Sequence, residues 1–144
     1  MTPLIFVLNG PNLNLLGTRE PHIYGTETLD EIAASLSARA AELGVALDIR
    51  QSNHEGHLID WLHEAQHDGA KAVILNPGGY GHTSVALHDA VKAIATPVIE
   101  VHLSDPDTRE AFRHSDLVAL AASLVIKGEG ARGYLTALDA AARL

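Results

Sequence analysis

The chain contains no cysteine among its 144 residues, so disulfide bonds and thiolate chemistry are both excluded. No apolar run approaches the roughly 20 residues that a membrane-spanning helix needs. No basic stretch precedes the first apolar run, so we expect no signal peptide. Basic residues are also scarce, with 10 Lys and Arg against 18 Asp and Glu. Nucleic-acid binders usually carry a basic face, so we predict a cytoplasmic protein that binds neither nucleic acid nor membrane.

The residues that are present describe a globular protein. Hydrophobic residues make up 47% of the chain and charged residues 19%, which predicts one domain over residues 1–144. Nine histidines raise the possibility of a metal site. No HExxH or comparable ligand spacing accompanies them, so we expect most of them at surface or helix positions and predict no metal.

Apolar runs alternate with segments of helical periodicity along the whole chain. The apolar runs predict strands at residues 4–8, 45–50, 72–75, 98–101 and 124–127. The helical segments are residues 28–43, 54–66, 84–94 and 131–143, with a short helix at 107–114. This alternation predicts an α/β protein, a flavodoxin-like three-layer fold with a five-stranded parallel sheet in the order 2-1-3-4-5.

The connection after the first strand is unusually long. Residues 8–25 form a loop of about eighteen residues, where such connections typically need about two to six. Loops of this length in compact domains usually bind ligands or act as lids. Tyr24 and Arg19 lie in this loop, and a guanidinium near a phenol favours the phenolate. The alternative is that Tyr24 only packs the loop down and Arg19 is solvated.

Polar side chains follow four strands in succession. Ligands of parallel sheets bind beyond the carboxyl ends of the strands, so this edge is a predicted site, built from Asn9, Asn12, Ser52, Asn53, His54, Glu55, Asn76, His82, Glu100, His102 and Ser104. Glu100 and His102 share one face of their strand, which suits a general acid and the carboxylate that orients it. A histidine satisfied within the core is the alternative interpretation of His102.

A glycine-rich loop at residues 76–84 leads into the third long helix. Backbone N–H groups at a helix N-terminus attract anions, either phosphate or carboxylate. The loop matches neither a Walker A pattern nor a dinucleotide fingerprint. Its glycines could instead serve only the turn.

Several motifs together resemble the type II 3-dehydroquinases, the type II 3-dehydroquinate dehydratases. They cover nearly the whole chain and comprise Asn9-Gly10-Pro11-Asn12, Gly17, Arg19, Pro21, Tyr24-Gly25, the segment 51–56, Asn76-Pro77-Gly78, His82-Thr83-Ser84, the segment 101–104 and Gly133-Tyr134.

The resemblance implies dehydration of 3-dehydroquinate to 3-dehydroshikimate without a metal or cofactor. It assigns Tyr24 as the base assisted by Arg19, His102 as the acid oriented by Glu100, and Asn12 as a donor to the enolate through a water. It further implies substrate contacts from Asn76, His82, Asp89, Leu103, Ser104 and Arg113, and a neighbouring subunit could supply Asp89. It also implies trimers that assemble into a dodecamer, to which the apolar stretch 117–124 could contribute.

Some positions depart from the pattern that the resemblance leads us to expect. They are Gly79, Gly81, His57, His88, Asp105, Asp107 and Glu129. None removes a predicted catalytic group. Three other classes stay open from the sequence: a flavodoxin-like module that binds a nucleotide or FMN, a histidine-based metallohydrolase, and a pure interaction protein.

Overall fold

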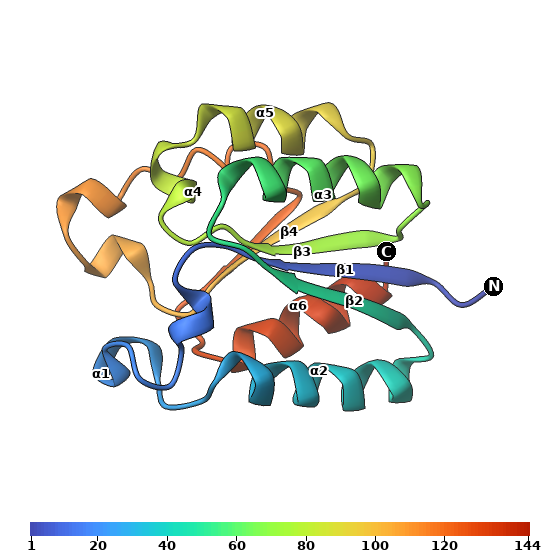
Figure 1. Ribbon diagram of the computed structural model, residues 1–144, viewed down its shortest axis with the longest axis horizontal. Helices are drawn as coiled ribbons and strands as arrows, with labels where there is room; N and C mark the ends of the chain where they lie inside the picture. The colour runs from blue at the N-terminus through green and yellow to red at the C-terminus, as the bar shows by residue number, and fades with distance from the viewer.

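A computed structural model describes residues 1–144 as a parallel sheet between two layers of helices (Figure 1). The strands are β1 (Leu4–Asn9), β2 (Ala46–Gln51), β3 (Ala72–Asn76), β4 (Val98–His102) and β5 (Leu124–Lys127). All neighbouring strands are parallel, in the order β2-β1-β3-β4-β5. The predicted fold class and strand order are therefore confirmed.

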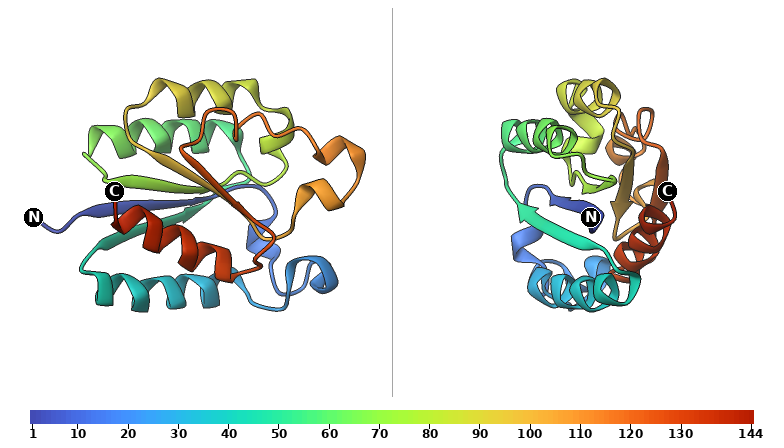
Figure 2. Two further views of the ribbon diagram at one scale, coloured as in Figure 1. Left: turned by 180° about the vertical axis from the view of Figure 1, so that it is seen from behind. Right: turned by 90° about the vertical axis from the view of Figure 1, so that its right-hand side faces the viewer.

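Each face of the sheet is covered by a pair of helices (Figures 1 and 2). Helices α2 (Leu29–Leu43) and α6 (Arg132–Ala142) pack together on one face, and α3 (Glu55–His67) and α5 (Val85–Ala93) pack together on the other. A capping box between Thr28 and Glu31 starts α2, and Gly44 ends it in the left-handed conformation with φ 72°. None of these helices is long and apolar enough to cross a membrane.

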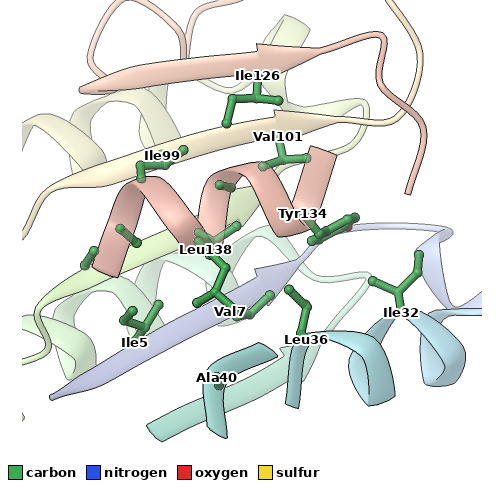
Figure 3. Packing of buried hydrophobic residues seen from close by; sticks show 14 of the residues in the cluster. Ile5, Val7, Ile32, Leu36, Ala40, Ile99, Val101, Ile126, Tyr134 and Leu138 are labelled. Carbon is green, nitrogen blue, oxygen red and sulfur yellow. The ribbon is translucent and has the colours of Figure 1, made fainter. Parts of the chain in front are cut away.

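Alternate side chains of the central strands enter two separate cores. Ile5 and Val7 of β1 lie in the core under α2 and α6, and Phe6 and Leu8 lie in the core under α3 and α5. Figure 3 shows the first of these cores, in which Tyr134 of α6 lies among aliphatic side chains. Burial on both faces makes β1 and β3 continuous hydrophobic runs. Their polar ends, Asn9 and Asn76, are buried too.

The loops differ from prediction more than the core does. The prediction of a short helix at 107–114 is wrong, because this segment forms two 3-10 turns, η2 (Pro106–Thr108) and η3 (Ala111–Arg113). The Asp105 side chain caps η2, and Arg109 then adopts an extended conformation that interrupts any helix. The long first loop contains a 3-10 turn, η1 (Leu13–Leu15), and one turn of helix, α1 (Pro21–Tyr24). The glycine-rich loop likewise contains a turn of helix, α4 (Tyr80–Thr83).

The stretch 117–124 is only partly a buried crossover. Val118 is fully buried, whereas Leu120 is 78% exposed and Leu124 on the edge strand β5 is 44% exposed. The side chains of Leu120 and Leu124 therefore face outward in the single chain.

Candidate active site

A cleft of about 350 Å³ lies at the carboxyl ends of the strands, on the side where α1 and the turns η2 and η3 project (Figure 1). It takes side chains from the first loop, α4, the end of β4 and the turns that follow. Its lining contains the predicted residues Asn12, Arg19, Tyr24, Asn76, His82, His102, Leu103, Ser104 and Arg113. The sheet therefore brings together side chains separated by up to about a hundred positions.

Seven predicted residues lie outside the lining: the strand-end residues Asn9, Ser52, Asn53, His54 and Glu55, and also Glu100 and Asp89. Glu100 is fully buried beneath His102, two residues earlier on β4. Asp89 lies on the exposed face of α5 and does not reach the cleft of its own chain. Its predicted role as a contact from a neighbouring subunit stays a prediction.

A buried hydrogen-bond network joins the ends of the two central strands. The Tyr134 hydroxyl donates to Asn9 Oδ1 at 2.6 Å and accepts from Asn76 Nδ2 at 3.0 Å. Asn76 Oδ1 accepts from the backbone N–H of Gly78 at 3.1 Å, which shapes the glycine-rich loop. Burial strongly disfavours the phenolate form of Tyr134 and raises its pKa. This tyrosine therefore has a structural role and supports the floor of the cleft.

His102, Glu100 and Asp116 form a second polar group beside the cleft. The Nε2 atom of His102 lies 2.6 Å from Glu100 Oε2 and 3.3 Å from Asp116 Oδ2. His102 and Glu100 are buried, and the Asp116 side chain is 19% exposed. Glu100 Oε1 has no hydrogen-bond partner. His102 is satisfied by these carboxylates and also lines the cleft, so its catalytic role stays a prediction.

The charges of this group are strongly coupled. Burial opposes a charge on His102, but the hydrogen bonds to Asp116 and Glu100 outweigh it and raise the pKa of His102 to about 9. Burial raises the pKa of Glu100 to about 7, although the hydrogen bond with His102 works against this. For Asp116, burial is outweighed by its hydrogen bonds with His102 and Glu100, which hold its pKa well below the usual range. The favoured state at neutral pH is therefore an imidazolium beside an ionised Asp116.

Glu100, His102 and Asp116 also form the only cluster of histidine and carboxylate side chains that is compact enough to hold a metal ion. Zn–N and Zn–O distances of about 2.0–2.2 Å place two ligand atoms about 3 Å or more apart. The 2.6 Å separation between His102 Nε2 and Glu100 Oε2 is shorter than that and matches a direct, charge-assisted hydrogen bond. The geometry fits a cluster that holds a proton.

Tyr24 lies between two guanidinium groups. Arg19 lies 4.4 Å and Arg109 lies 5.1 Å from the centroid of the Tyr24 ring. The Tyr24 hydroxyl makes no hydrogen bond within the protein, and the ring packs against the edge of the core. The structure thus combines the two sequence interpretations: Tyr24 packs the loop down and also faces the cleft beside cations.

Other side chains complete the walls. His82 Nδ1 donates to the Ser115 carbonyl at 2.7 Å, and its ring stacks on that of His102 with centroids 6.2 Å apart. Arg113 pairs with Glu110, and Arg109 reaches Ser104 Oγ at 3.3 Å.

Sequence reasoning missed Asp116 and Arg109. Asp116 follows no strand directly and belongs to no motif, so no local pattern indicated a site residue there. Arg109 was placed in a short helix, where a charged side chain is usually solvated. Contacts across the fold bring Asp116 to His102 and Arg109 to Tyr24. A single sequence contains no local pattern that predicts either of these long-range contacts.

In this parallel α/β fold, a carboxylate-paired histidine at the end of β4 and a tyrosine of α1 beside two arginines line one cleft, an arrangement typical of an enzyme active site. The chain belongs to the class II dehydroquinase family, whose pattern it matches over residues 3–142. The family is one of hydro-lyases, so the resemblance stated from the motifs is confirmed.

Relatives and solved structures agree with this membership. The chain is 57% identical over 141 residues to the 3-dehydroquinate dehydratase of Caulobacter vibrioides, covering 98% of this chain and 96% of that protein. It is 58% identical over 141 residues to that of Maricaulis maris, with the same coverage. The type II dehydroquinase from Propionibacterium acnes superposes with a TM-score of 0.95 at 42% identity, covering 100% of this chain and 99% of that one. These comparisons favour a dehydroquinase over the three other classes considered above.

Proposed function

We propose that this enzyme dehydrates 3-dehydroquinate to 3-dehydroshikimate, a step of the shikimate pathway to aromatic amino acids. The names of its relatives support the substrate. The observation that carries the chemistry is the cleft itself, where Tyr24 flanked by two guanidiniums and His102 paired with two carboxylates face one space.

Tyr24 is the base. The reaction removes a proton from C2, the carbon next to the ketone, and a phenolate can accept it. A free phenol ionises only near pH 10, so the base needs help at neutral pH. The guanidiniums of Arg19 and Arg109 lie 4.4 Å and 5.1 Å from the ring centroid and are the groups that assist the base in this proposal.

The enolate that forms next carries negative charge on the former ketone oxygen. Asn12 is the donor for that oxygen, acting through a water, since its exposed side chain lines the cleft. Its backbone is fixed in a left-handed conformation with φ 69°, and its N–H donates to Asn53 Oδ1 at 3.0 Å.

His102 is the acid. It gives a proton to the departing C1 hydroxyl, the C–O bond breaks, and water leaves. Glu100 orients the ring through Nε2. Tyr24 and His102 come from different elements and can address opposite faces of the substrate ring, which favours the anti elimination that the resemblance implies.

Substrate binding explains the remaining lining. The substrate carboxylate lies near the backbone of Leu103 and Ser104, with Asn76 close by, and His82 and Arg113 add contacts. The chain as a whole has a formal net charge of −8, yet three arginines, Arg19, Arg109 and Arg113, line this cleft. Their local positive charge favours an anionic substrate despite the acidic surface.

The assembled enzyme is a dodecamer built from trimers, as the resemblance implies, in which Asp89 reaches a neighbouring cleft. Exposed apolar side chains support an association of subunits: Val85 is 60%, Phe112 68% and Leu120 78% exposed in the single chain. This assembly would be contradicted if light scattering showed a monomer and that monomer were fully active.

The activity itself is tested by adding 3-dehydroquinate to purified protein and following ultraviolet absorbance. Formation of the conjugated enone gives a rising signal, and the His102→Ala variant serves as the control for a contaminating dehydratase. Equal rates from both proteins, or no rise with the wild type, would refute the proposed function.

A further inference from the structure

Asp116 occupies a position that the mechanism above does not use. It follows η3 and is held against α4 from both sides: the carbonyl of Ser115 contacts His82 Nδ1 at 2.7 Å, and the N–H of Leu117 donates to the Gly81 carbonyl at 2.8 Å. Its Oδ1 accepts from the backbone N–H of Ala119 at 3.0 Å. These contacts leave Oδ2 directed at His102 Nε2, 3.3 Å away.

The two nitrogens of the His102 ring consequently face different surroundings. Nε2 faces two carboxylates, Glu100 Oε2 and Asp116 Oδ2. Nδ1 makes no hydrogen bond within the protein and is not among the buried polar atoms that lack a partner. Since the ring lines the cleft, Nδ1 is the nitrogen open to a ligand.

We propose that Asp116 is a positioning residue for His102: together with Glu100 it keeps a proton on Nε2, so that Nδ1 is the nitrogen that delivers a proton to the substrate. This inference rests on the proposed function, in which His102 is the acid. In the step, the Nδ1–H bond breaks and the proton joins the departing hydroxyl as the C–O bond breaks. His102 is left neutral with its remaining proton on Nε2, still held by both carboxylates.

Asp116 also has a consequence for pH dependence. Glu100 is the more deeply buried of the two carboxylates, and its own pKa is raised to about 7, so near neutral pH it is only partly charged. Asp116 stays ionised in this range and supplies a full negative charge beside the imidazolium. Without it, His102 should lose its second proton at a lower pH.

The other ionisable groups around the ring do not replace Asp116. His82 of α4 stacks on His102 with ring planes 24° apart. The remaining charged side chains of the cleft, Arg19, Arg109 and Arg113, are cations, which disfavour an imidazolium. Only Glu100 and Asp116 oppose them.

Gly81 provides the space for this arrangement. A Cβ atom there would lie 3.4 Å from Asp116 Oδ1, 3.7 Å from His102 Cε1 and 3.1 Å from Pro77 Cγ. The tightest of these contacts is with Pro77, and the other two are ordinary van der Waals distances. Gly81 therefore lies directly against both Asp116 and His102.

The test compares wild type with Asp116→Asn, in which the amide oxygen can still cap Ala119. Asp68→Asn is the control, because it removes one exposed negative charge just after the end of α3, away from the cleft. Each protein is labelled with ¹⁵N-histidine, His102 is assigned by its loss in His102→Asn, and its ring nitrogens are titrated. The pH profile of kcat is recorded in parallel.

We expect Asp116→Asn to lower the His102 midpoint by about 1 pH unit or more, since one nearby opposite charge typically shifts a pKa by about 1–3. The alkaline limb of kcat should move with it, and Asp68→Asn should move neither. In the wild type above its midpoint, the ¹⁵N shifts should place the remaining proton on Nε2. An unchanged midpoint, or a proton on Nδ1, would overturn the inference.

Two further results separate the inference from the proposed function. A lowered midpoint with an unmoved kcat limb would support the role of Asp116 and refute His102 as the acid. If Asp116→Asn does not fold, Asp116→Ser takes its place, because it also removes the negative charge and its hydroxyl can still accept from the Ala119 N–H. It should lower the midpoint in the same direction, and an unchanged midpoint there would equally overturn the inference.

Discussion

Tyr24 and His102 line the same cleft, but they are held in different ways. The lid segment, residues 12–25, makes backbone hydrogen bonds only within itself, apart from the bond of the Asn12 N–H to Asn53. It is attached mainly by Leu13 and Leu16, whose side chains enter the core. The strand-end network consists of two separate groups, each held by side-chain hydrogen bonds or ion pairs: Asn9, Asn76 and Tyr134, and Glu100, His102 and Asp116.

In the proposed mechanism, this difference divides the two proton-transfer groups between a fixed part and an adjustable part. An acid that must hold a proton near two carboxylates needs a rigid, buried setting. A base on a loop can close over the substrate and exclude water. Changes in the network should therefore affect both activity and stability, whereas changes in the lid segment should affect activity alone.

His102→Ala should produce the largest combined effect. We expect kcat to fall by about 10²- to 10⁴-fold, which is typical for loss of a general acid. Glu100 is fully buried and would lose its donor, so the free energy of unfolding should fall by about 1–3 kcal/mol. Steady-state kinetics and urea unfolding measure the two effects. A loss of activity with unchanged stability would contradict the expectation that changes in the network affect both properties.

Tyr24→Phe should lower kcat by a similar factor of about 10²- to 10⁴-fold. Its stability should stay within about 0.5 kcal/mol of the wild type, because the Tyr24 hydroxyl has no hydrogen-bond partner in the protein. The ring and its contacts with Arg19 and Arg109 are retained. Near wild-type kcat in this variant would mean that Tyr24 is not the base.

Tyr134→Phe makes the same chemical change inside the network and is the matched counterpart of Tyr24→Phe. Removing this hydroxyl leaves Asn9 Oδ1 and Asn76 Nδ2 without their shared partner. We expect a loss of about 1–3 kcal/mol in urea unfolding, with a smaller effect on kcat than Tyr24→Phe. Equal stability of the two Phe variants would remove the distinction between the network and the lid segment.

Exhaustive chelation, or borohydride treatment in the presence of substrate, should leave the activity unchanged. The enolate route uses neither a metal nor a lysine imine, and none of the three lysines, Lys71, Lys92 and Lys127, lines the cleft. Activity after EDTA dialysis and the mass of the borohydride-treated protein measure this. Loss of activity, or a reduced substrate adduct, would contradict the mechanism.

The sequence predicts those parts of the molecule that periodicity and local motifs encode. The strands, the four long helices and the sheet order follow from apolar runs, the Thr28 capping box and the alternation of elements. The pairing of Glu100 with His102 follows from their spacing on one strand. The turns η2 and η3 could not be predicted as such, because the extended conformation of Arg109 depends on contacts outside the segment. Asp116 was missed for the same reason, since its partner His102 comes from another element.

The central claim is that a base on the lid segment and an acid on the strand-end network act from opposite faces of the substrate. The most direct test uses 3-dehydroquinate deuterated stereospecifically at C2, with mass spectrometry of the product. Anti elimination through Tyr24 and His102 predicts that the label anti to the C1 hydroxyl is lost and that the syn label stays in the product. Retention of the anti label would contradict the account, even if the overall dehydration were observed.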